Sequence, residues 1–290
     1  MGLSELIERA LDEDVGFGDV TTESCIPGSA TGLATIRAKQ PLVVCGQEAA
    51  RRVFEGVAAR FGGSVSVTTL VEDGAHVTND TKITRLEGSL RSILIGERLA
   101  LNIMMKLSGI ATNVHEWVAA SGPDGPSIVD TRKTTPLLRN LEKYAVRCGG
   151  GKNHRMALFD GVMIKDNHIV SVGSIKKAVH RVRANAHHLL KIEVEVASIA
   201  EVQLALDAGA DVLLLDNMNN TMLAEAVALA RAVRPEVILE ASGNMNPQRI
   251  SELRGLDLDV ISAGGLIHQA TWVDLSLTVH ERSDVQRLAE

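Results

Sequence analysis

The chain has 290 residues, a formal net charge of −6, and a hydrophobic fraction of 45%. This composition supplies a large buried core, while no uninterrupted apolar run is long enough to span a bilayer. The acidic balance and the scarcity of aromatic residues, 2% of the chain, argue against nucleic acid as a partner. An enzyme that acts on a small molecule is the class that these features favour.

The N-terminal segment MGLSELIERALDEDVG is acidic and amphipathic. It lacks the basic start and the apolar centre of a signal peptide. The three cysteines, Cys25, Cys45 and Cys148, show no metal-binding spacing, which is typical of unpaired thiols in a reducing compartment. We therefore expect a cytoplasmic protein.

The first hundred residues carry helix signals at both ends and strand signals between them. In chain order the expected elements are a helix at 3–11, a loop at 12–22, strands at 33–39 and 41–46, a helix at 47–60, strand-like sequence at 64–94 and a helical run at 96–105. This order predicts an antiparallel sheet with helices packed on it. The domain boundary is expected near residue 100, inside the last helix.

Beyond residue 100, strand and helix signals alternate. The expected strands are Ser127–Asp130, Val162–Lys165, Lys191–Val196, Asp211–Asp216, Val237–Ala241 and Asp259–Ser262, and the expected helices lie near 137–147, 173–185, 198–207, 220–232 and 247–253. Such alternation predicts parallel strands with right-handed crossovers, in either a barrel or a doubly wound sheet. Every expected strand ends in polar residues, which favours a closed or nearly closed barrel whose strand ends surround one site.

The segment from Asp130 to His168 differs in charge from the rest of the chain. It holds eight Lys or Arg against four Asp or Glu, a net charge of +4, which leaves −10 for the remaining residues. A local excess of this sign indicates a site for a small anion. Within it, the cations of residues 137–147 fit the solvated stripe of a helix. The cations that follow strand-like runs directly, Arg132, Lys133 and Lys165, are functional candidates.

Two acidic residues lie at the ends of neighbouring expected strands, Glu195 and Asp216. Such a pair could hold Mg²⁺ or face a developing positive charge. The alternative, in which Asp216 only caps the following helix, is equally compatible with the spacing. In the same strand as Glu195, Glu193 is expected to form a structural ion pair with Lys191.

Glycine-containing loops follow the last two expected strands, at Ser242-Gly243 and at Gly264-Gly265. Turns that need positive φ explain each loop alone, but the two on adjacent strands together favour phosphate binding. A third glycine run precedes His154 and Arg155. The run lacks the spacing of a P-loop. The side chains of His154 and Arg155 after it are donors suited to a carboxylate.

The segments DTRKTTP, EKYAVRCGGGKNHR, MIKDNH and LEASG together resemble the quinolinate phosphoribosyltransferase family, also called nicotinate-nucleotide pyrophosphorylase (carboxylating). The likeness covers nearly the whole chain. It implies an N-terminal α/β sandwich domain at 1–100, joined by 270–290, and an incomplete α/β barrel of six or seven strands at 101–269. It also implies a homodimer with active sites shared between subunits.

The resemblance also implies substrates and roles. Quinolinate would be held by Arg132, His154, Arg155 and Lys165 of one subunit and by Arg98 of its neighbour. Phosphoribosyl pyrophosphate would be bound by Lys133 and His268, with its 5′-phosphate near Ser242, Gly243, Gly264 and Gly265. The expected catalytic residues are Lys133, Lys165, Glu195 and Asp216, and the last two would also hold Mg²⁺.

The activity implied is transfer of the phosphoribosyl group to quinolinate with decarboxylation, a step of NAD biosynthesis. Three alternatives stay open: a related pyrophosphorylase for a different aromatic acid, a lyase or aldolase that uses a Schiff-base lysine, and a non-catalytic binding protein. The sequence also departs from the family, which usually has Gly at Leu137 and Ala157 and more often reads GALTHS than GGLIHQ at 264–269.

Overall fold

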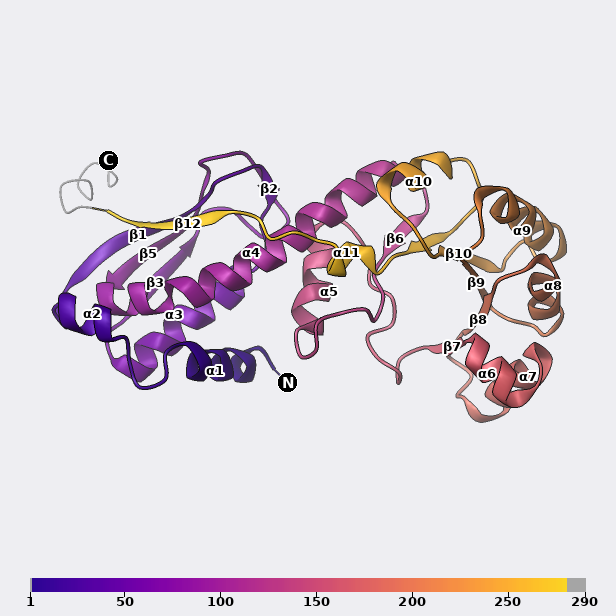
Figure 1. The fold of residues 1–290 in the computed structure, drawn as a ribbon, viewed down its shortest axis with the longest axis horizontal. Helices are drawn as coiled ribbons and strands as arrows, with labels where there is room; N and C mark the ends of the chain where they lie inside the picture. Colours follow the sequence, from indigo (N-terminus) through magenta and orange to yellow (C-terminus); the bar gives the residue numbers. More distant parts are fainter. Residues whose placement is uncertain (1, 281–290) are drawn as a thin grey trace. The chain divides into compact units, whose positions relative to one another are not determined.

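The computed structural model describes residues 2–280, which fold as two compact units. Of the described residues, the first unit contains 2–115, 135–150 and 270–280, and the second contains 116–134 and 151–269. Figure 1 shows the chain in sequence colours, with each unit drawn around its own sheet.

The first unit is organised around a four-stranded antiparallel sheet. Its strand order is β12 (Leu275–Val279), β1 (Thr31–Ala38), β5 (Lys82–Ser89) and β3 (Val65–Thr69). A short separate pair is formed by β2 (Leu42–Val43) and β4 (His76–Val77). The edge strand β12 comes from the segment 270–290, which the resemblance implied would join this domain, although residues 281–290 lie outside the described residues.

Helices pack against this sheet, and the hydrophobic core of the unit lies between them. Helix α1 (Leu3–Asp14) packs against α3 (Gln47–Phe61), and α4 (Leu90–Ser121) follows β5 directly. Phe54 of α3 and Met104 of α4 are fully buried in the hydrophobic core of the unit. The elements are therefore those expected of an antiparallel sheet with helices packed on it.

Two local expectations for this unit are wrong. Residues 12–22, expected to be a loop, include the end of α1 and the start of α2 (Val20–Cys25), because Asp19 caps α2 by accepting the N–H groups of Thr21 and Thr22. The expected strand-like sequence also ends early. Helix α4 begins at Leu90, where the Ser89 hydroxyl accepts the Ser92 N–H at 3.3 Å and so caps the first turn.

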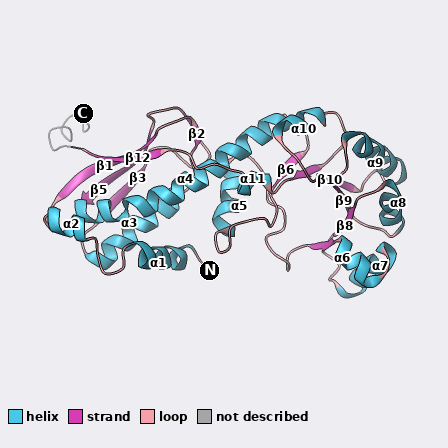
Figure 2. Ribbon diagram, viewed as in Figure 1, coloured by secondary structure: helices cyan, strands magenta, loops and turns pink. Residues whose placement is uncertain are grey.

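The second unit contains a parallel six-stranded sheet. Its order is β6 (Ser127–Val129), β11 (Val260–Ser262), β10 (Ile238–Ser242), β9 (Val212–Asp216), β8 (Ile192–Val196) and β7 (Val162–Ile164). Strands β7 to β11 pair in sequence order and β6 returns beside β11, which is the order of a barrel. The barrel is incomplete because β6 and β7 are the two edges of the sheet. Figure 2 shows the helices of this unit in cyan and its strands in magenta.

Helices connect these strands. They are α6 (Asp166–Val172), α7 (Ile175–Asn185), α8 (Ile199–Asp207), α9 (Asn220–Val233), α10 (Pro247–Glu252) and α11 (Gly265–His268). Polar side chains cap α7, α8, α9 and α10 at Ser174, Ser198, Asn219 and Asn246. The sequence did not predict α6, which begins immediately after β7 inside the polar KDNH motif.

The connection between β6 and β7 leaves the barrel. It contains α5 (Arg139–Cys148), which belongs to the first unit, whereas the expected division placed it in the barrel domain. Glu142 of α5 is buried there, with its carboxylate 3.0 Å from Lys106 Nζ and accepting the Thr135 N–H at 2.8 Å. The expectation of a solvated cationic stripe is wrong for Lys143, which is also fully buried.

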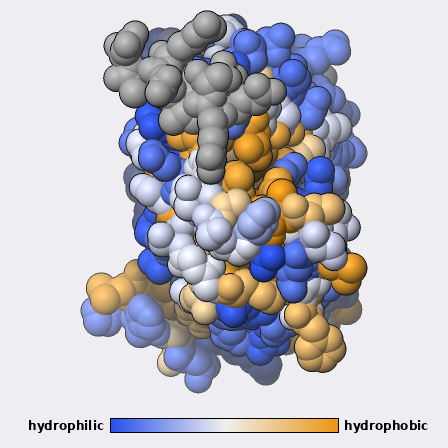
Figure 3. Space-filling model, turned by 90° about the vertical axis from the view of Figure 1, so that its left-hand side faces the viewer, coloured by the Kyte–Doolittle hydropathy of each residue, from blue (hydrophilic) through white to orange (hydrophobic). Residues whose placement is uncertain are grey.

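Within residues 2–280, none of the helices has both the length and the apolar character needed to cross a bilayer. Hydrophilic side chains dominate the face that Figure 3 shows, with smaller hydrophobic patches between them. Several large apolar side chains of the described residues are well exposed, among them Phe17, Val20, Leu158 and Phe159.

Candidate active site

A cavity of about 800 Å³ lies in the second unit, and residues that follow or end the six parallel strands line it. Twelve of the thirteen residues singled out from the sequence are among its lining residues: Arg132, Lys133, His154, Arg155, Lys165, Glu195, Asp216, Ser242, Gly243, Gly264, Gly265 and His268. The thirteenth, Arg98, is an exposed residue of α4 in the first unit. The structure thus brings the candidates of the second unit together in one cavity, and Arg98 belongs to the other unit.

The segment that follows β6 contains two cations of the cavity lining, Arg132 and Lys133. Asp130 is fully buried and accepts hydrogen bonds from Asn153 Nδ2 at 2.6 Å and from the His154 N–H at 2.9 Å. This carboxylate therefore fixes the glycine-led segment beside the end of β6. Arg132 extends into the cavity lining, and its buried Nε has no hydrogen-bond partner among the described residues. An unsatisfied guanidinium N–H at a cavity wall is a ready donor for an anion.

Arg155 lies close enough to Arg132 for the two charges to interact. Burial, followed by the charge of Arg132, lowers the pKa of Arg155. Its own Nη1 donates to the Gly161 carbonyl at 2.9 Å, which orients the guanidinium. Two neighbouring guanidinium groups repel each other unless an anion lies between them, so this wall is suited to a carboxylate.

His154 faces two buried acids, an arrangement that the sequence did not predict. Its Nδ1 accepts the Arg155 N–H at 2.7 Å, which leaves the Nε2 proton pointing to Glu193 Oε2 at 3.4 Å and Glu240 Oε2 at 3.6 Å. The expected pairing of Glu193 with Lys191 is wrong. Glu193 points into the barrel, where it is 6% exposed, whereas Lys191 is exposed at the start of the strand.

The two acids of this group are only partly satisfied. Glu193 Oε1 and Glu240 Oε1 have no hydrogen-bond partner among the described residues. Burial, followed by the charge of Glu193, raises the pKa of Glu240 to about 7. The signal that could have identified Glu240 is an acidic residue inside an otherwise apolar strand, since a carboxylate is seldom buried without a function or a partner.

At the other edge of the sheet, Lys165 follows β7 and pairs with Glu195 of β8. The ammonium lies 3.1 Å from Glu195 Oε2, and the lysine side chain remains 48% exposed. Asp216 ends β9, where its Oδ2 accepts a hydrogen bond from Asn217 Nδ2 at 2.7 Å. It does not cap the following helix, because Asn219 fills that position by accepting the Met222 N–H.

The glycines of the last two loops have separate structural reasons. Gly243 has a φ of +89°, and a Cβ there would lie 2.2 Å from Asn217 Oδ1, so the turn alone requires glycine. At Gly264, a Cβ would lie 2.6 Å from Lys133 Cδ and 3.1 Å from His268 Nε2. This glycine therefore lets two expected phosphate ligands approach the same backbone.

Two groups of side chains in the cavity have donor atoms for a cation. Glu195 and Asp216 supply carboxylate oxygens from adjacent strands, and Mg²⁺ commonly binds through one or two carboxylates together with substrate phosphates. The second group, His154, Glu193 and Glu240, has its ligand atoms within 4.8 Å of one another. Its histidine is already oriented by the two acids.

Family models match almost the full chain. The N-terminal domain of quinolinate phosphoribosyl transferase matches residues 19–108, and the C-terminal domain matches residues 110–278. A probable nicotinate-nucleotide pyrophosphorylase [carboxylating] from Synechocystis is 41% identical, covering 94% of this chain and 91% of that protein. The nicotinate-nucleotide pyrophosphorylase [carboxylating] of Mycobacterium leprae is 37% identical, with 94% and 95% covered.

Solved structures of similar proteins have the same fold over nearly the full chain. NadC from Streptococcus pyogenes has a TM-score of 0.89 at 39% identity, covering 96% of this chain and 97% of that chain. The nicotinate-nucleotide pyrophosphorylase of Francisella tularensis has a TM-score of 0.88 at 35% identity, with 96% of each chain covered. The chain therefore belongs to the quinolinate phosphoribosyl transferase family.

Proposed function

We propose that this protein transfers the phosphoribosyl group of phosphoribosyl pyrophosphate to quinolinate. The products are nicotinate mononucleotide, CO₂ and pyrophosphate, in NAD biosynthesis. The observation that carries the proposal is the single cavity lined by both the expected quinolinate cations and the expected phosphoribosyl ligands. Family membership supports the same reaction.

Quinolinate carries two adjacent carboxylates on a planar ring. Arg132 offers an unpartnered Nε and Arg155 a second guanidinium nearby, which suits bidentate recognition of such groups. His154 lines the same wall, and Glu193 and Glu240 fix the orientation of its ring. These side chains would hold the ring with its nitrogen facing the sugar carbon.

Phosphoribosyl pyrophosphate would lie along the later strands. Lys133 and His268 meet at Gly264, where an ammonium and an imidazole converge on one backbone and favour a polyanion. The loops at Ser242-Gly243 and Gly264-Gly265 would approach the 5′-phosphate, because small residues allow close contact with backbone N–H groups.

The reaction places positive charge on the sugar as pyrophosphate leaves. Glu195 and Asp216, at the ends of β8 and β9, would stabilise that charge while the quinolinate nitrogen forms the new bond to the sugar. Loss of CO₂ then leaves an electron pair on the ring carbon next to nitrogen, which takes up a proton. Lys165, an ammonium beside Glu195, would stabilise the developing negative charge.

Mg²⁺ fits the donor set of Glu195 and Asp216, since hard oxygen ligands and substrate phosphates are what this ion prefers. When bound, it would supply charge neutralisation for the pyrophosphate leaving group. The residues of the chain then need only position the leaving group and screen the sugar cation.

A homodimer with shared active sites completes the proposal. Arg98 is exposed on α4 of the first unit, free to reach the cavity of a neighbouring subunit. The exposed apolar side chains Phe17, Val20, Leu158 and Phe159 are the kind of surface that a second subunit covers. A cytoplasmic location accords with three free thiols.

The proposal is tested by incubating the protein with Mg²⁺, quinolinate and phosphoribosyl pyrophosphate while pyrophosphate and CO₂ are measured. Arg132→Ala should reduce turnover by about 10²-fold or more, since it removes a bidentate carboxylate donor from the cavity. Lys191→Ala removes an exposed cation at the start of β8 and serves as the matched control. Near-normal turnover of the Arg132 variant would contradict the assigned role.

The same assay separates the alternatives. A related pyrophosphorylase for another aromatic acid would release pyrophosphate with nicotinate but no CO₂. A Schiff-base lyase would form a covalent adduct between its substrate and a lysine, and we expect borohydride trapping to give no such adduct. A non-catalytic binding protein would bind both substrates without releasing pyrophosphate.

A further inference from the structure

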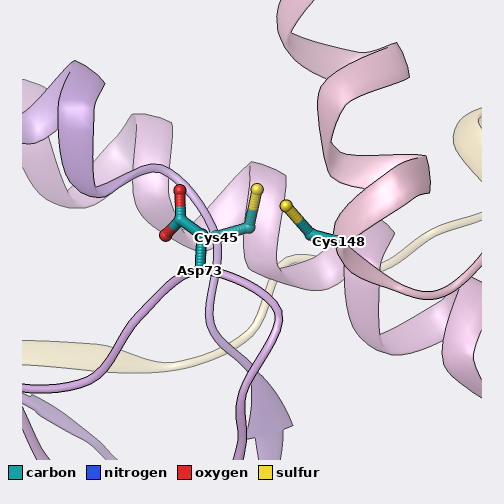
Figure 4. A group of neighbouring side chains, drawn as sticks. All are labelled: Cys45, Asp73 and Cys148. Carbon is teal, nitrogen blue, oxygen red and sulfur yellow. The ribbon is translucent and has the colours of Figure 1, made fainter.

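We propose that Cys45 and Cys148 are a redox modification site, two thiols that close reversibly into a disulfide within the first unit. Together with Asp73 they form a cluster whose sulfur and oxygen atoms lie within 4.8 Å of one another. Figure 4 shows the two sulfur atoms directed toward each other, one from the segment before α3 and one from the end of α5. None of the three residues is among those that line the cavity of the barrel.

Backbone hydrogen bonds fix the position of Cys45. Its N–H donates to the Ser108 hydroxyl at 2.9 Å, and that hydroxyl donates to the Cys45 carbonyl at 3.1 Å. Beside it, the Val44 N–H donates to the Ala75 carbonyl at 3.0 Å, and the Gly74 N–H donates to the Val44 carbonyl at 2.8 Å. The thiol is thereby held next to the turn that carries Asp73.

Asp73 organises the cluster without being its reactive group. Its Oδ1 accepts the Gln47 N–H at 3.2 Å, and its Oδ2 accepts the Tyr144 hydroxyl at 2.9 Å. These two bonds connect the start of α3 with α5, the helix that ends at Cys148. The carboxylate therefore anchors both elements that carry the thiols.

The two thiols differ in access and in acidity. Cys45 is completely buried, whereas Cys148 is only partly buried. The hydrogen bond with Cys45 lowers the pKa of Cys148, and the same thiol contact followed by burial raises the pKa of Cys45. Cys148 is thus the accessible nucleophile and Cys45 the resolving thiol.

The oxidant is a low-molecular-weight disulfide such as oxidised glutathione. The Cys148 thiolate attacks one of its sulfurs and expels the other as a thiolate, which takes up a proton. Cys45 then loses its proton and attacks the Cys148 sulfur of the mixed disulfide, forming the Cys45–Cys148 bond and expelling the second glutathione thiolate. Two protein thiols are oxidised and one disulfide is reduced to two thiols, so electrons and atoms balance.

A metal ion is the competing use of the same residues. Structural zinc sites have four protein ligands, and the cluster offers three of the usual kind among residues 2–280. Both carboxylate oxygens of Asp73 moreover already accept hydrogen bonds, one from the Gln47 N–H and one from the Tyr144 hydroxyl. Disulfide formation needs neither a fourth ligand nor any change at Asp73.

Closing the bond would tie the segment before α3 to the end of α5, which lie far apart in the sequence. A disulfide across so long a loop restricts the unfolded chain more than the folded one. The oxidised protein should therefore melt at a higher temperature than the reduced protein. Gly149, Gly150 and Gly151 follow Cys148 directly and lead to His154, so the bond would also fix one end of that glycine run.

The test uses the full-length protein in glutathione buffers of graded potential, followed by acid quenching, alkylation and mass spectrometry of peptides. A Cys25→Ser background removes the exposed third thiol. We expect a Cys45–Cys148 cross-linked peptide whose reduced-to-oxidised ratio changes tenfold per about 30 mV, the slope of a two-electron couple. In Cys45→Ser the reaction should stop at one glutathione on Cys148, and oxidation should leave its melting temperature lower than that of the oxidised parent.

Two results would overturn the proposal. One is full alkylation of both thiols at the most oxidising potential, with no glutathione on Cys148 in Cys45→Ser. The other is protection of both thiols that a chelator abolishes, which would identify a metal site. Cys148→Ser, in which Cys45 should remain unmodified, checks the assignment of the nucleophile: a glutathione adduct on Cys45 would contradict it.

Discussion

Lys133, in the loop that follows β6, is in contact with Gly264, in the loop that follows the neighbouring strand β11. A Cβ placed on Gly264 would lie 2.6 Å from Lys133 Cδ, closer than real side chains approach. His268 Nε2 is 3.1 Å from the same point. The absence of a side chain at one position therefore determines where two expected ligands of phosphoribosyl pyrophosphate lie.

Gly264→Ala should displace Lys133 and weaken binding of phosphoribosyl pyrophosphate while leaving the fold intact. We expect its KM to rise by about tenfold, equivalent to ~1.4 kcal/mol, with a smaller change for quinolinate. Gly28→Ala is the control, because the nearest atom to its added Cβ would be at 3.7 Å. Steady-state kinetics with each substrate varied in turn gives both values. An unchanged KM would mean that Lys133 does not bind this substrate.

Glu240 should make stability depend on pH. Its pKa is raised from 4.5 to about 7, so the folded state holds this proton more tightly than the unfolded chain. The resulting stabilisation is complete below about pH 4.5 and is lost as the pH rises through about 7, a change on the order of 3 kcal/mol.

Glu240→Gln keeps the shape of the side chain and removes the titration. Urea unfolding at pH 5 and pH 8 should show a smaller loss of unfolding free energy for this variant than for the parent. Comparing the two proteins cancels the contribution of the other titrating groups. Equal losses in the two proteins would show that Glu240 titrates normally.

Leu137 has a φ of +69° and is exposed. A left-handed conformation costs a residue with a Cβ about 1–2 kcal/mol. Glycine avoids this cost, but its unfolded chain has more conformational entropy to lose on folding, which offsets part of the gain. Leu137→Gly should therefore raise the unfolding free energy by ~0.5–1 kcal/mol. Leu137→Ala retains the Cβ and should give no such gain, and a destabilised glycine variant would refute the strain.

Shared active sites predict complementation between two inactive variants. Arg98→Ala and Arg132→Ala should each lose activity as homodimers. In a heterodimer of the two, one site would combine the intact Arg98 of one subunit with the intact Arg132 of the other. Random exchange of subunits should then restore about a quarter of the parent activity. No recovery after verified exchange would place Arg98 outside the site.

The sequence sufficed to predict the barrel and most of the cavity because both depend on local pattern. Apolar runs that end in polar residues indicate parallel strands, and their common edge brings Arg132, Lys165 and Asp216 to one cavity. The caps of α2 and α4 were missed because Asp19 and Ser89 act through side-chain bonds that periodicity does not reveal.

The errors at buried charges have a different cause. Glu193 and Lys143 were assigned to exposed or locally paired positions because their neighbours in sequence suggested it. Their burial depends on residues distant in the chain, such as His154 facing Glu193. Tertiary contacts of this kind are invisible to a pattern of neighbours, and they place charged residues where the functional chemistry is concentrated.

The most direct measurement of the central claim compares quinolinate with nicotinate, which lacks the second carboxylate. In the presence of phosphoribosyl pyrophosphate and Mg²⁺, the account predicts one CO₂ and one pyrophosphate for each quinolinate consumed, and a kcat/KM for nicotinate lower by about 10³-fold or more, because Arg132 and Arg155 would face an absent partner. Comparable values for the two acids, or pyrophosphate release without CO₂ from quinolinate, would contradict it.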